Sequence, residues 1–574
     1  MSTFCITPRC GLCRFRLHDG ELIIIGEPGS ISSHCLSDLT IVKAGQSSEE
    51  MVYERIMVDL QKSRYITCVG DCSHLDGKTT GCHVECANQI TPWPVTEAIE
   101  VLAFEYEPTA HEKDDRRSWL HHKLSVLLDK VLVRLPRELC SLIAGLCLRS
   151  YAVECARALR AVPSGESSIQ LSSKIWGHFT DFEGSSYLSS LSNNNDDCHT
   201  QLMYVPKSMS TVTTIYLAED YFGVRLISFC GGSTPTVENC RDLWWRAMDL
   251  ESSPTLVAQN KGPKLRCFVP KDATLKQQQL TNVLWAIPPP KMPRMVQLER
   301  SPEATKMSAV LCNNPSIVAY SVHWDTRIMS IHTHTLKEEL STYQNRDNGI
   351  WLFFPLYRNE KVVEVWIRGS ERLDLALLFR TSHGRTLVFG PHLSMQPRTR
   401  LALIDVLPQD VETRIFIEKS PVGIRNVAFE SPSPETASSH SISLPQPTYK
   451  IPISTLQTPW FYSTASLDGV EDILPCVRSM GGRTRIIGLL LHYIDGHEAC
   501  LGQVRLDCLG VPIRLLGCAS VWCGISADRY GTYVVSFELS RPVHDQNIYL
   551  IEMNFRDSVD WWYSYHYSKI YPRK

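Results

Sequence analysis

Four residues near the N-terminus have the types and spacing of a metal site. Cys10 and Cys13 form a Cys-x2-Cys pair, and His83 and Cys86 form a His-x2-Cys pair in the segment GCHVECAN. A gap of two residues lets both side chains of a pair leave one tight turn toward one ion, and zinc prefers thiolate and imidazole ligands in tetrahedral geometry. The four residues therefore predict a structural Zn2+ site, because a closed set of four ligands leaves no open position for catalysis.

Other cysteines and histidines in residues 1–95 leave alternatives open. Cys82 competes with His83 for the same site, and a second site could form from four further residues: Cys5, Cys68, Cys72 and His74. A third possibility is a small domain without metal, in which the thiols are simply buried. The Cys-x2-Cys pair, a β-hairpin predicted after it and the His-x2-Cys pair follow one another in an order that resembles a treble-clef or LIM-like zinc module. The long separation of the two ligand pairs implies an insertion between them.

The hydrophobic pattern becomes helical in residues 115–165. Leu139, Leu142, Ile143 and Leu146 recur at i, i+3, i+4 and i+7, which places them on one stripe of a helix. Pro136 lies just before this stripe, where a helix start tolerates its missing N–H. Similar stripes before and after it predict a box of three short helices.

The segment LPRELCSLIAGLC resembles the opening of an F-box. That resemblance implies docking of residues 134–160 on a Skp1-type adaptor of a cullin-based ubiquitin ligase, while the rest of the chain selects the substrate. The implied adaptor-binding residues are Leu135, Pro136, Leu139, Leu142 and Ile143. The alternative is a structural helical segment whose apolar face packs on its neighbours.

The C-terminal part alternates as strands do, and it repeats itself. IYLAEDYFGVRLISF (215–229) matches IFIEKSPVGIRNVAF (415–429), and LALLFRTSHGRTLVFG (375–390) matches IGLLLHYIDGHEACLG (487–502). Each member of the second pair predicts a β-hairpin with a His-Gly or Asp-Gly turn. The sequence thus predicts a multidomain α+β protein with a zinc-like head, a three-helix box and a large all-β part. The expected divisions are 1–95, 115–165, 200–345, 346–430, a Ser/Pro-rich linker at 431–455, and 456–574.

Two architectures fit the repeated hairpins. A β-prism or sandwich is preferred because RIIGLLLHYIDGHEACLGQ is similar to the strand pattern of jacalin-like β-prism lectins. The family's sugar-binding loop is not evident here, so the resemblance bears on the fold more than on sugar binding. A β-propeller is the alternative, although the hairpins are not evenly spaced. The doubled tryptophans at 244–245 and 561–562 predict that one ring of each pair is exposed or lies at a domain interface, because neighbours on a strand face opposite sides.

Several classes of function are not expected. The chain has no G-x-S-x-G, P-loop, Rossmann or HExxH motif, so we expect no enzyme. His332 and His334 share one strand face, but no acidic third ligand is expected beside them. A net charge of -3 gives no support for a nucleic-acid partner. The start lacks the pattern of a secretory signal, and no apolar stretch reaches the roughly 20 residues of a membrane helix. We therefore expect a cytoplasmic or nuclear protein with mostly reduced cysteines and no membrane contact.

Taken together, these features resemble fungal-type multidomain F-box-like proteins of unassigned function. The resemblance implies a protein-interaction role, with an unknown substrate or ligand on the β-rich part. An alternative is a carbohydrate-binding module, for which we expect an aromatic and acidic pocket at hairpin tips near Asp468 or Asp495. A further alternative is a structural protein whose repeats only pack.

Overall fold

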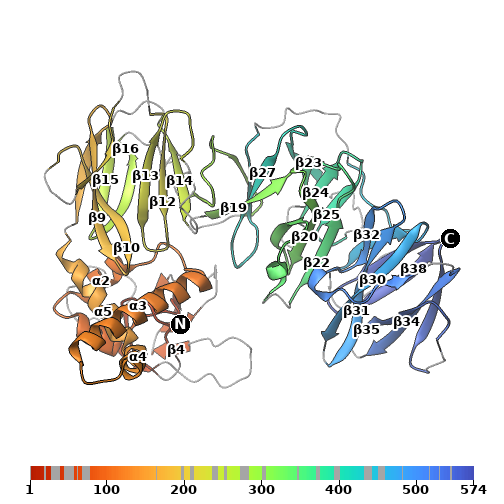
Figure 1. Cartoon of the computed structure of the whole chain (residues 1–574), viewed down its shortest axis with the longest axis horizontal. Coiled ribbons are helices and arrows are strands. Elements are labelled where there is room, and N and C mark those ends of the chain that lie inside the picture. Colours follow the sequence, from red (N-terminus) through yellow and green to blue (C-terminus); the bar gives the residue numbers. More distant parts are fainter. Residues whose placement is uncertain are drawn as a thin grey trace. The chain divides into compact units, whose positions relative to one another are not determined.

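The chain forms two compact units, residues 1–290 and 291–574, each described here by itself (Figure 1). Both are rich in β-strands, and the α-helices lie in the first unit. The computed structural model describes residues 2–18, 21–26, 39–43, 57–60, 63–67, 78–162, 164–195, 200–206, 212–235, 243–250, 255–271, 283–299, 305–344, 348–369, 375–392, 401–431, 442–449, 459–480, 482–515, 518–528, 531–542 and 546–573.

The N-terminal head combines two small sheets with two helices. One sheet has the order β4-β5-β1-β6 and the other β3-β2-β7. The elements are β1 (Ser2–Ile6), β2 (Leu22–Gly26), β3 (Leu39–Lys43), β4 (Met57–Leu60), β5 (Ser63–Thr67), β6 (Lys78–Thr79), β7 (Gly81–His83), α1 (Val84–Ile90) and α2 (Val95–Leu102). Because α1 begins directly after β7, residues on both elements converge on one point of the core.

Three helices follow the head, as the periodicity predicts. They are α3 (Ala110–Val131), α4 (Arg137–Leu146) and α5 (Leu148–Ala158), with the short 3-10 helix η2 (Leu159–Ala161) after them. Thr109 and Glu112 form a capping box at the start of α3, which satisfies two backbone N–H groups there. Among the described residues, no single helix is long and apolar enough to cross a membrane, but the bent pair Arg137–Leu146 and Leu148–Ala161 passes that test jointly.

A β-sandwich completes the first unit and starts earlier than the expected boundary at residue 200. Its strands are β8 (Gly165–Gln170), β9 (Ile175–Phe182), β10 (Ser185–Ser192), β11 (Thr200–Tyr204), β12 (Thr214–Glu219), β13 (Val224–Cys230), β14 (Trp244–Asp249), β15 (Thr255–Lys261), β16 (Lys264–Pro270) and β17 (Val283–Trp285). The Ser-rich strand β10 buries Leu188 and Leu191. A register shift between Leu188 and Ser190 hides its alternation in the sequence.

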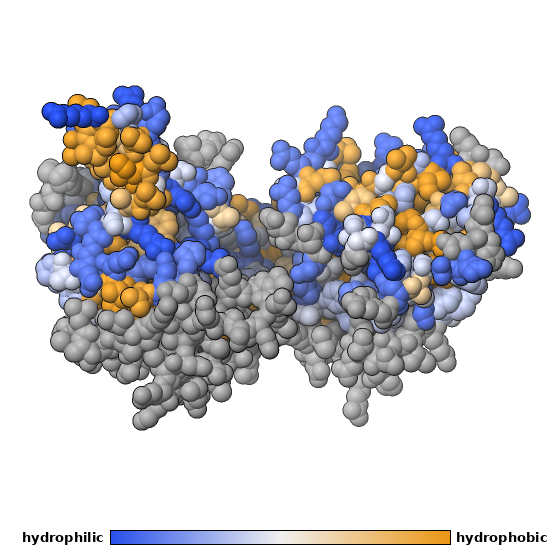
Figure 2. All heavy atoms as spheres, turned by 90° about the horizontal axis from the view of Figure 1, so that it is seen from below, coloured by the Kyte–Doolittle hydropathy of each residue, from blue (hydrophilic) through white to orange (hydrophobic). Residues whose placement is uncertain are grey.

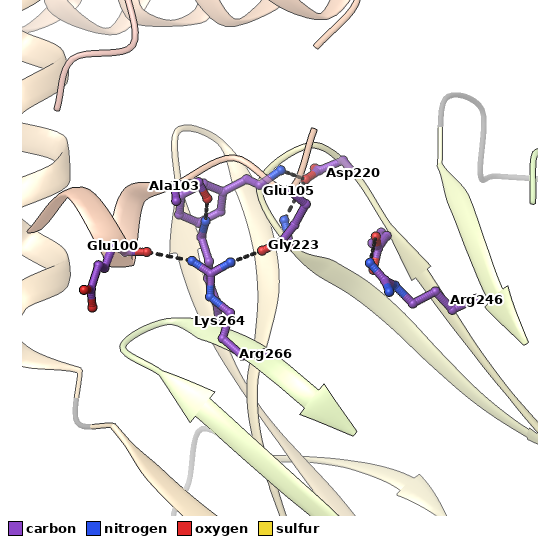
Figure 3. A network of polar contacts seen from close by, with 10 residues as sticks. Glu100, Ala103, Glu105, Asp220, Gly223, Arg246, Lys264 and Arg266 are labelled. Carbon is purple, nitrogen blue, oxygen red and sulfur yellow. Dashed lines mark hydrogen bonds and ion pairs between the residues drawn. The ribbon is translucent and has the colours of Figure 1, made fainter. Parts of the chain in front are cut away.

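Polar contacts connect the head to this sandwich (Figure 3). Arg266 of β16 pairs with Glu105 and donates to the carbonyl of Glu100 at 2.7 Å. Lys264 is buried, donates to the Ala103 carbonyl, and lies 4.0 Å from the centroid of the Phe222 ring. Burial, with repulsion from Arg266, lowers the pKa of Lys264 well below its ordinary value. The end of α2 is therefore held on the sandwich by specific charged groups.

The second unit consists of several sheets around one continuous apolar core, which extends from Val310 to Ile570. Its first strands are β18 (Arg294–Gln297), β19 (Thr305–Cys312), β20 (Ile317–Trp324), β21 (Ile328–Thr335), β22 (Ile350–Pro355), β23 (Val362–Arg368), β24 (Ala376–Thr381), β25 (Thr386–Phe389), β26 (Leu401–Val406), β27 (Thr413–Glu418) and β28 (Asn426–Phe429). The later strands are β29 (Phe461–Ser466), β30 (Val470–Met480), β31 (Arg483–Tyr493), β32 (Glu498–Gly502), β33 (Ile513–Arg514), β34 (Ser520–Asp528), β35 (Gly531–Glu538), β36 (Tyr549–Asn554), β37 (Ser558–Tyr563) and β38 (Ser568–Arg573). Two 3-10 helices, η3 (Leu340–Tyr343) and η4 (Leu506–Cys508), interrupt them.

Both sequence repeats are hairpins with matching registers. Ile215 faces Phe229 across β12 and β13, and Ile415 faces Phe429 across β27 and β28. In the second repeat, Leu377 of β24 pairs with Phe389 of β25. The equivalent positions, Leu489 of β31 and Leu501 of β32, pair in the same way. The hairpins predicted for the second repeat are therefore confirmed, and the structure shows that the first repeat also forms hairpins, with equivalent cross-strand pairs in both copies of each repeat.

Two details differ from the sequence prediction. Both rings of each tryptophan pair are buried, because Trp245 lies on a strand inside its sheet and β37, which carries Trp561 and Trp562, is central in the order β29-β37-β38. In the segment expected to be a linker, residues 442–449 pack on the second unit. Leu444 is buried against Trp366 and Leu378, so this stretch belongs to the folded body.

Candidate functional site

The predicted zinc ligands gather in one buried cluster in the head. Cys10, Cys13, His83 and Cys86 each offer one ligand atom, and these atoms all lie within 4.8 Å of one another. All four residues are at most 3% exposed. His83 Nδ1 lies 3.4 Å from Cys13 Sγ and 3.6 Å from Cys86 Sγ. Three thiols and one imidazole nitrogen therefore converge on a space that could hold a metal ion, and this donor set is compatible with zinc.

Local structure explains the convergence. The turn that carries Cys10 and Cys13 is fixed to β7 by a hydrogen bond from Gly11 N–H to the Gly81 carbonyl at 2.8 Å. A Cβ on Gly11 would lie 2.6 Å from the Thr80 side chain, so this approach requires glycine. His83 ends β7, and Cys86 lies in the first turn of α1. The strand-to-helix junction thus delivers the second ligand pair to the first.

A carboxylate supports the imidazole from the other side. His83 Nε2 lies 3.2 Å from Glu21 Oε2, and Glu21 also pairs with Arg149 of α5 at 2.7 Å. A metal-binding histidine commonly gives its other ring nitrogen to a carboxylate, which fixes the ring and its tautomer. Glu21 had no signal in the sequence analysis, because its role depends on the packing of α5 against the head.

The alternative metal ligands predicted from the sequence differ in where they lie. Cys82 is buried beside the cluster, but its side chain is not one of the four that converge. Of the residues proposed for a second site, Cys68, Cys72 and His74 lie outside the described residues. The geometry thus selects His83 over Cys82 and leaves the second site as a prediction.

The predicted adaptor-binding residues lie largely on the surface of the helical box. Leu139 and Leu142 are 44% and 65% exposed, and Leu135 and Pro136 are also exposed, while Ile143 is half-buried. The side of α4 that packs inside the unit carries the small residues Cys140 and Ala144 instead. The leucine stripe of α4 is therefore turned outward, and a hydrophobic area is visible on this face of the N-terminal unit (Figure 2).

The second unit contains a pocket of about 670 Å³. Three turns border it: the turn before Arg385, the turn at Asp468 and the turn at Asp495. Strand β29 and the start of β25 form further walls. The volume lies within the range of roughly 300–1,000 Å³ that is common for small-molecule sites.

Aromatic rings cluster where the two repeated hairpins meet. The Tyr357 ring lies 5.0 Å from the His497 ring and 5.9 Å from the His383 ring, so it stands between the turns of the two copies. His497 also stacks on Tyr493 with centroids 3.9 Å apart. Arg385 lies 4.0 Å over the Tyr357 ring and donates to Glu360 at 2.8 Å. These contacts hold the aromatic rings and the Arg385 guanidinium in fixed positions on one side of the pocket.

Two carboxylates border the same pocket. A hydrogen bond from His497 N–H, together with the His497 ring, holds the pKa of Asp495 below its usual value, and this side chain is 69% exposed. Asp468 is also exposed, and its carboxylate accepts no hydrogen bond from the part of the chain that the structure describes. Both side chains offer acceptor oxygens to the pocket, and Asp468 is exposed there to the donors of a ligand.

The sequence indicated only part of this site. Asp468 and Asp495 were expected near hairpin tips, and the turn residue His497 was explained by turn chemistry alone. Tyr357 and Arg385 were missed. Tyr357 belongs to no motif, and Arg385 follows the turn of the repeated hairpin 375–390, but only the packing of one hairpin on the other brings them together at the pocket.

Comparisons with known proteins are sparse. No family model matches the chain, and no curated protein matches it. Among solved structures, a crystal structure of a prostate-specific WGA16 glycoprotein lectin is similar to part of it. The sequence identity is 18%, the TM-score is 0.16, and the match covers 25% of this chain and 100% of the lectin chain. The F-box resemblance has no support from these comparisons and stays a prediction.

Proposed function

We propose that the second unit is a carbohydrate-binding module without catalytic activity. The observation that carries this proposal is the pocket in which the turns of both repeated hairpins and the turn at Asp468 bring aromatic rings and two carboxylates together. Sugars present both an apolar C–H face and arrays of hydroxyl donors, so a ring beside a carboxylate complements them. The large core shared by strands from β19 to β38 and the unequal sheets favour a prism-like or sandwich-like architecture over a propeller.

Three pocket residues have definite roles in this proposal. Asp468 accepts hydrogen bonds from sugar hydroxyls, and Tyr357 offers a ring face held in place by Arg385. Arg385 itself is anchored to Glu360 and the Pro355 carbonyl, which keeps the ring from moving when the pocket fills. Such pre-organisation lowers the entropy cost of binding.

A glycan array followed by calorimetry tests this proposal. We expect the full-length protein to bind at least one neutral oligosaccharide, and Asp468→Asn and Tyr357→Ala each to weaken that binding at least tenfold. Asp410→Asn is the matched control, because Asp410 is an exposed carboxylate outside the pocket. An array without any binder, or equal affinity in all three variants, would remove the proposal.

A second function is favoured by the outward leucine stripe of α4. The helical box would dock on a Skp1-type adaptor through Leu135, Pro136, Leu139, Leu142 and Ile143, and the second unit would then act as the receptor of a ubiquitin ligase. Exposed leucines on a short helix lose solvent contact only when a partner covers them. This surface is independent of the sugar pocket, so the two functions can be tested separately.

Purified adaptor and full-length protein test the docking directly. Leu142→Asp changes a side chain that is 65% exposed, so the fold should be retained while adaptor binding is lost. Leu336→Asp is the control, because Leu336 is 77% exposed in the other unit. If wild type and both variants fail to bind a Skp1-type adaptor, the helices are structural.

We also propose that the Cys10, Cys13, His83 and Cys86 cluster binds a structural Zn2+ ion. The residues fit, since all four donor atoms are buried together and a carboxylate orients the histidine. When bound, the ion would fix the turn, the strand end and the helix start to one another.

A further inference from the structure

A second group of metal-binding side chains lies at the end of β21, far in sequence from the head. His332 and His334 face the same side of the strand, as expected, and their ring centroids are 4.7 Å apart. The expectation that no acidic ligand lies beside them is wrong. Glu338 turns back over the strand end, and one nitrogen of each histidine and one oxygen of Glu338 lie within 4.8 Å of one another.

A strained turn produces this arrangement. Lys337 has a φ of 65°, in the left-handed region that a residue with a Cβ rarely adopts. This conformation reverses the chain just after β21, so that Glu338 Oε2 accepts from Thr335 N–H at 3.2 Å. Glu338 Oε1 then lies 3.2 Å from His332 Nε2 and contacts His334 Nδ1. The strained backbone at Lys337 thus places a carboxylate oxygen of Glu338 between the imidazoles of His332 and His334.

The partners of His334 fix which of its nitrogens faces Glu338. Its Nε2 lies 2.6 Å from the Ser321 hydroxyl and 3.3 Å from the Tyr343 hydroxyl, and both of those residues are at most 1% exposed. The ring also stacks on Tyr343. Nδ1 therefore points at Glu338 and His332 in a fixed direction, with hydroxyl partners behind it of the kind that support metal-bound histidines.

We propose that His332, His334 and Glu338 bind one divalent transition-metal ion through His332 Nε2, His334 Nδ1 and Glu338 Oε1. Two imidazoles and a carboxylate are a donor set for Zn2+, Fe2+ or Co2+ rather than for Ca2+ or Mg2+. His334 is buried and His332 is 34% exposed, so the ion would keep positions open to solvent. The site differs from the head cluster in having no thiolate.

Co2+ alone is the probe, because cobalt bound to thiolates shows strong charge-transfer absorption and cobalt bound to imidazole and carboxylate does not. The full-length protein, with its head supplied with zinc, is titrated with Co2+ by calorimetry and absorption. We expect one Co2+ to bind without the thiolate absorption, and His332→Ala and Glu338→Gln each to weaken this binding at least tenfold.

His492→Ala is the matched control. Like His332, His492 is 34% exposed on a strand, and it lies between two carboxylates, Asp472 and Glu498. It belongs to neither of the two potential metal-binding groups found among the described residues. The control should bind Co2+ as wild type does. Equal Co2+ binding in wild type, His332→Ala and Glu338→Gln, or uptake only with thiolate absorption, would overturn the proposal and leave the three residues as a hydrogen-bonded group. Glu338→Gln keeps the side-chain volume, and unchanged near-ultraviolet circular dichroism verifies the fold.

Discussion

At the scale of single residues, the repeated hairpins differ in how closely their strands approach. In the hairpin of β31 and β32, a Cβ on Gly488 would lie 2.1 Å from the Gln503 carbonyl oxygen. The equivalent residue of the other copy is Ala376, and there Gly390 makes room for it. The equivalent of Gly390 is Gly502, where a Cβ would lie 2.6 Å from the Ile487 carbonyl oxygen, so both copies require glycine at this place and the second copy also requires it at Gly488.

Gly488→Ala is expected to destabilise the second unit by about 1–3 kcal/mol, because backbone atoms cannot move aside for the added methyl group. Denaturant unfolding monitored by tryptophan fluorescence measures the change. Gly145→Ala is the control, because the nearest atom to its added Cβ would be 3.9 Å away in an exposed helix. That change should stabilise the protein by up to about 1 kcal/mol; a loss of stability in both variants would contradict this account.

His392, at the edge of the pocket, makes stability depend on pH. Burial, with repulsion from Arg368, lowers the pKa of His392 to about 4. Between pH 6.5 and 4 the unfolded chain binds a proton here and the folded chain does not, so the free energy of unfolding falls as the pH falls through this window. His392→Gln should flatten that dependence in unfolding experiments at pH 7 and pH 5. His383→Gln, in an exposed turn, should leave it as in wild type.

At the scale of elements, α4 shows why an amphipathic stripe does not determine its own partner. The sequence places Leu139, Leu142, Ile143 and Leu146 on one stripe of the helix, and leaves open whether that stripe docks on a partner or packs inside the chain. In the structure, α4 packs on α3 and α5 through the side that carries Cys140 and Ala144, because small residues allow helices to approach closely. The leucines are left on the surface, with Leu146 88% exposed.

The elements of the head that carry the Cys10, Cys13, His83 and Cys86 cluster give a second prediction at this scale. Native mass spectrometry should find one Zn2+ fewer per chain in Cys13→Ser and Cys86→Ser than in wild type. Cys82→Ser should keep the ion, because Cys82 lies beside the cluster without contributing to it. Loss of the ion in Cys82→Ser but not in Cys86→Ser would show that Cys82 is the ligand.

At the scale of the whole molecule, the separate cores predict separate responses. The head core contains the three cysteines of the metal-like cluster and residues up to Phe222, whereas the main core of the second unit begins at Val310. We expect Cys86→Ser to reduce hydrogen-exchange protection in α1, α5 and β7 and to leave β24 and β31 protected, because local stability follows local packing. Equal loss of protection in both units would show that they unfold together.

The sequence alone indicated the repeats, the hairpins of the second repeat, the helical segment and the four predicted zinc ligands. The helices, the hairpins and each ligand pair depend on periodicity and on short spacings, which are local properties of the chain. Only the tertiary structure decided which neighbours complete each site. It placed Glu21 behind His83, Tyr357 between the turns of two hairpins, and Glu338 against His332 and His334. It also turned the leucines of α4 outward, because side-chain volumes in the packed core, and not hydrophobicity alone, decide which face of a helix is buried.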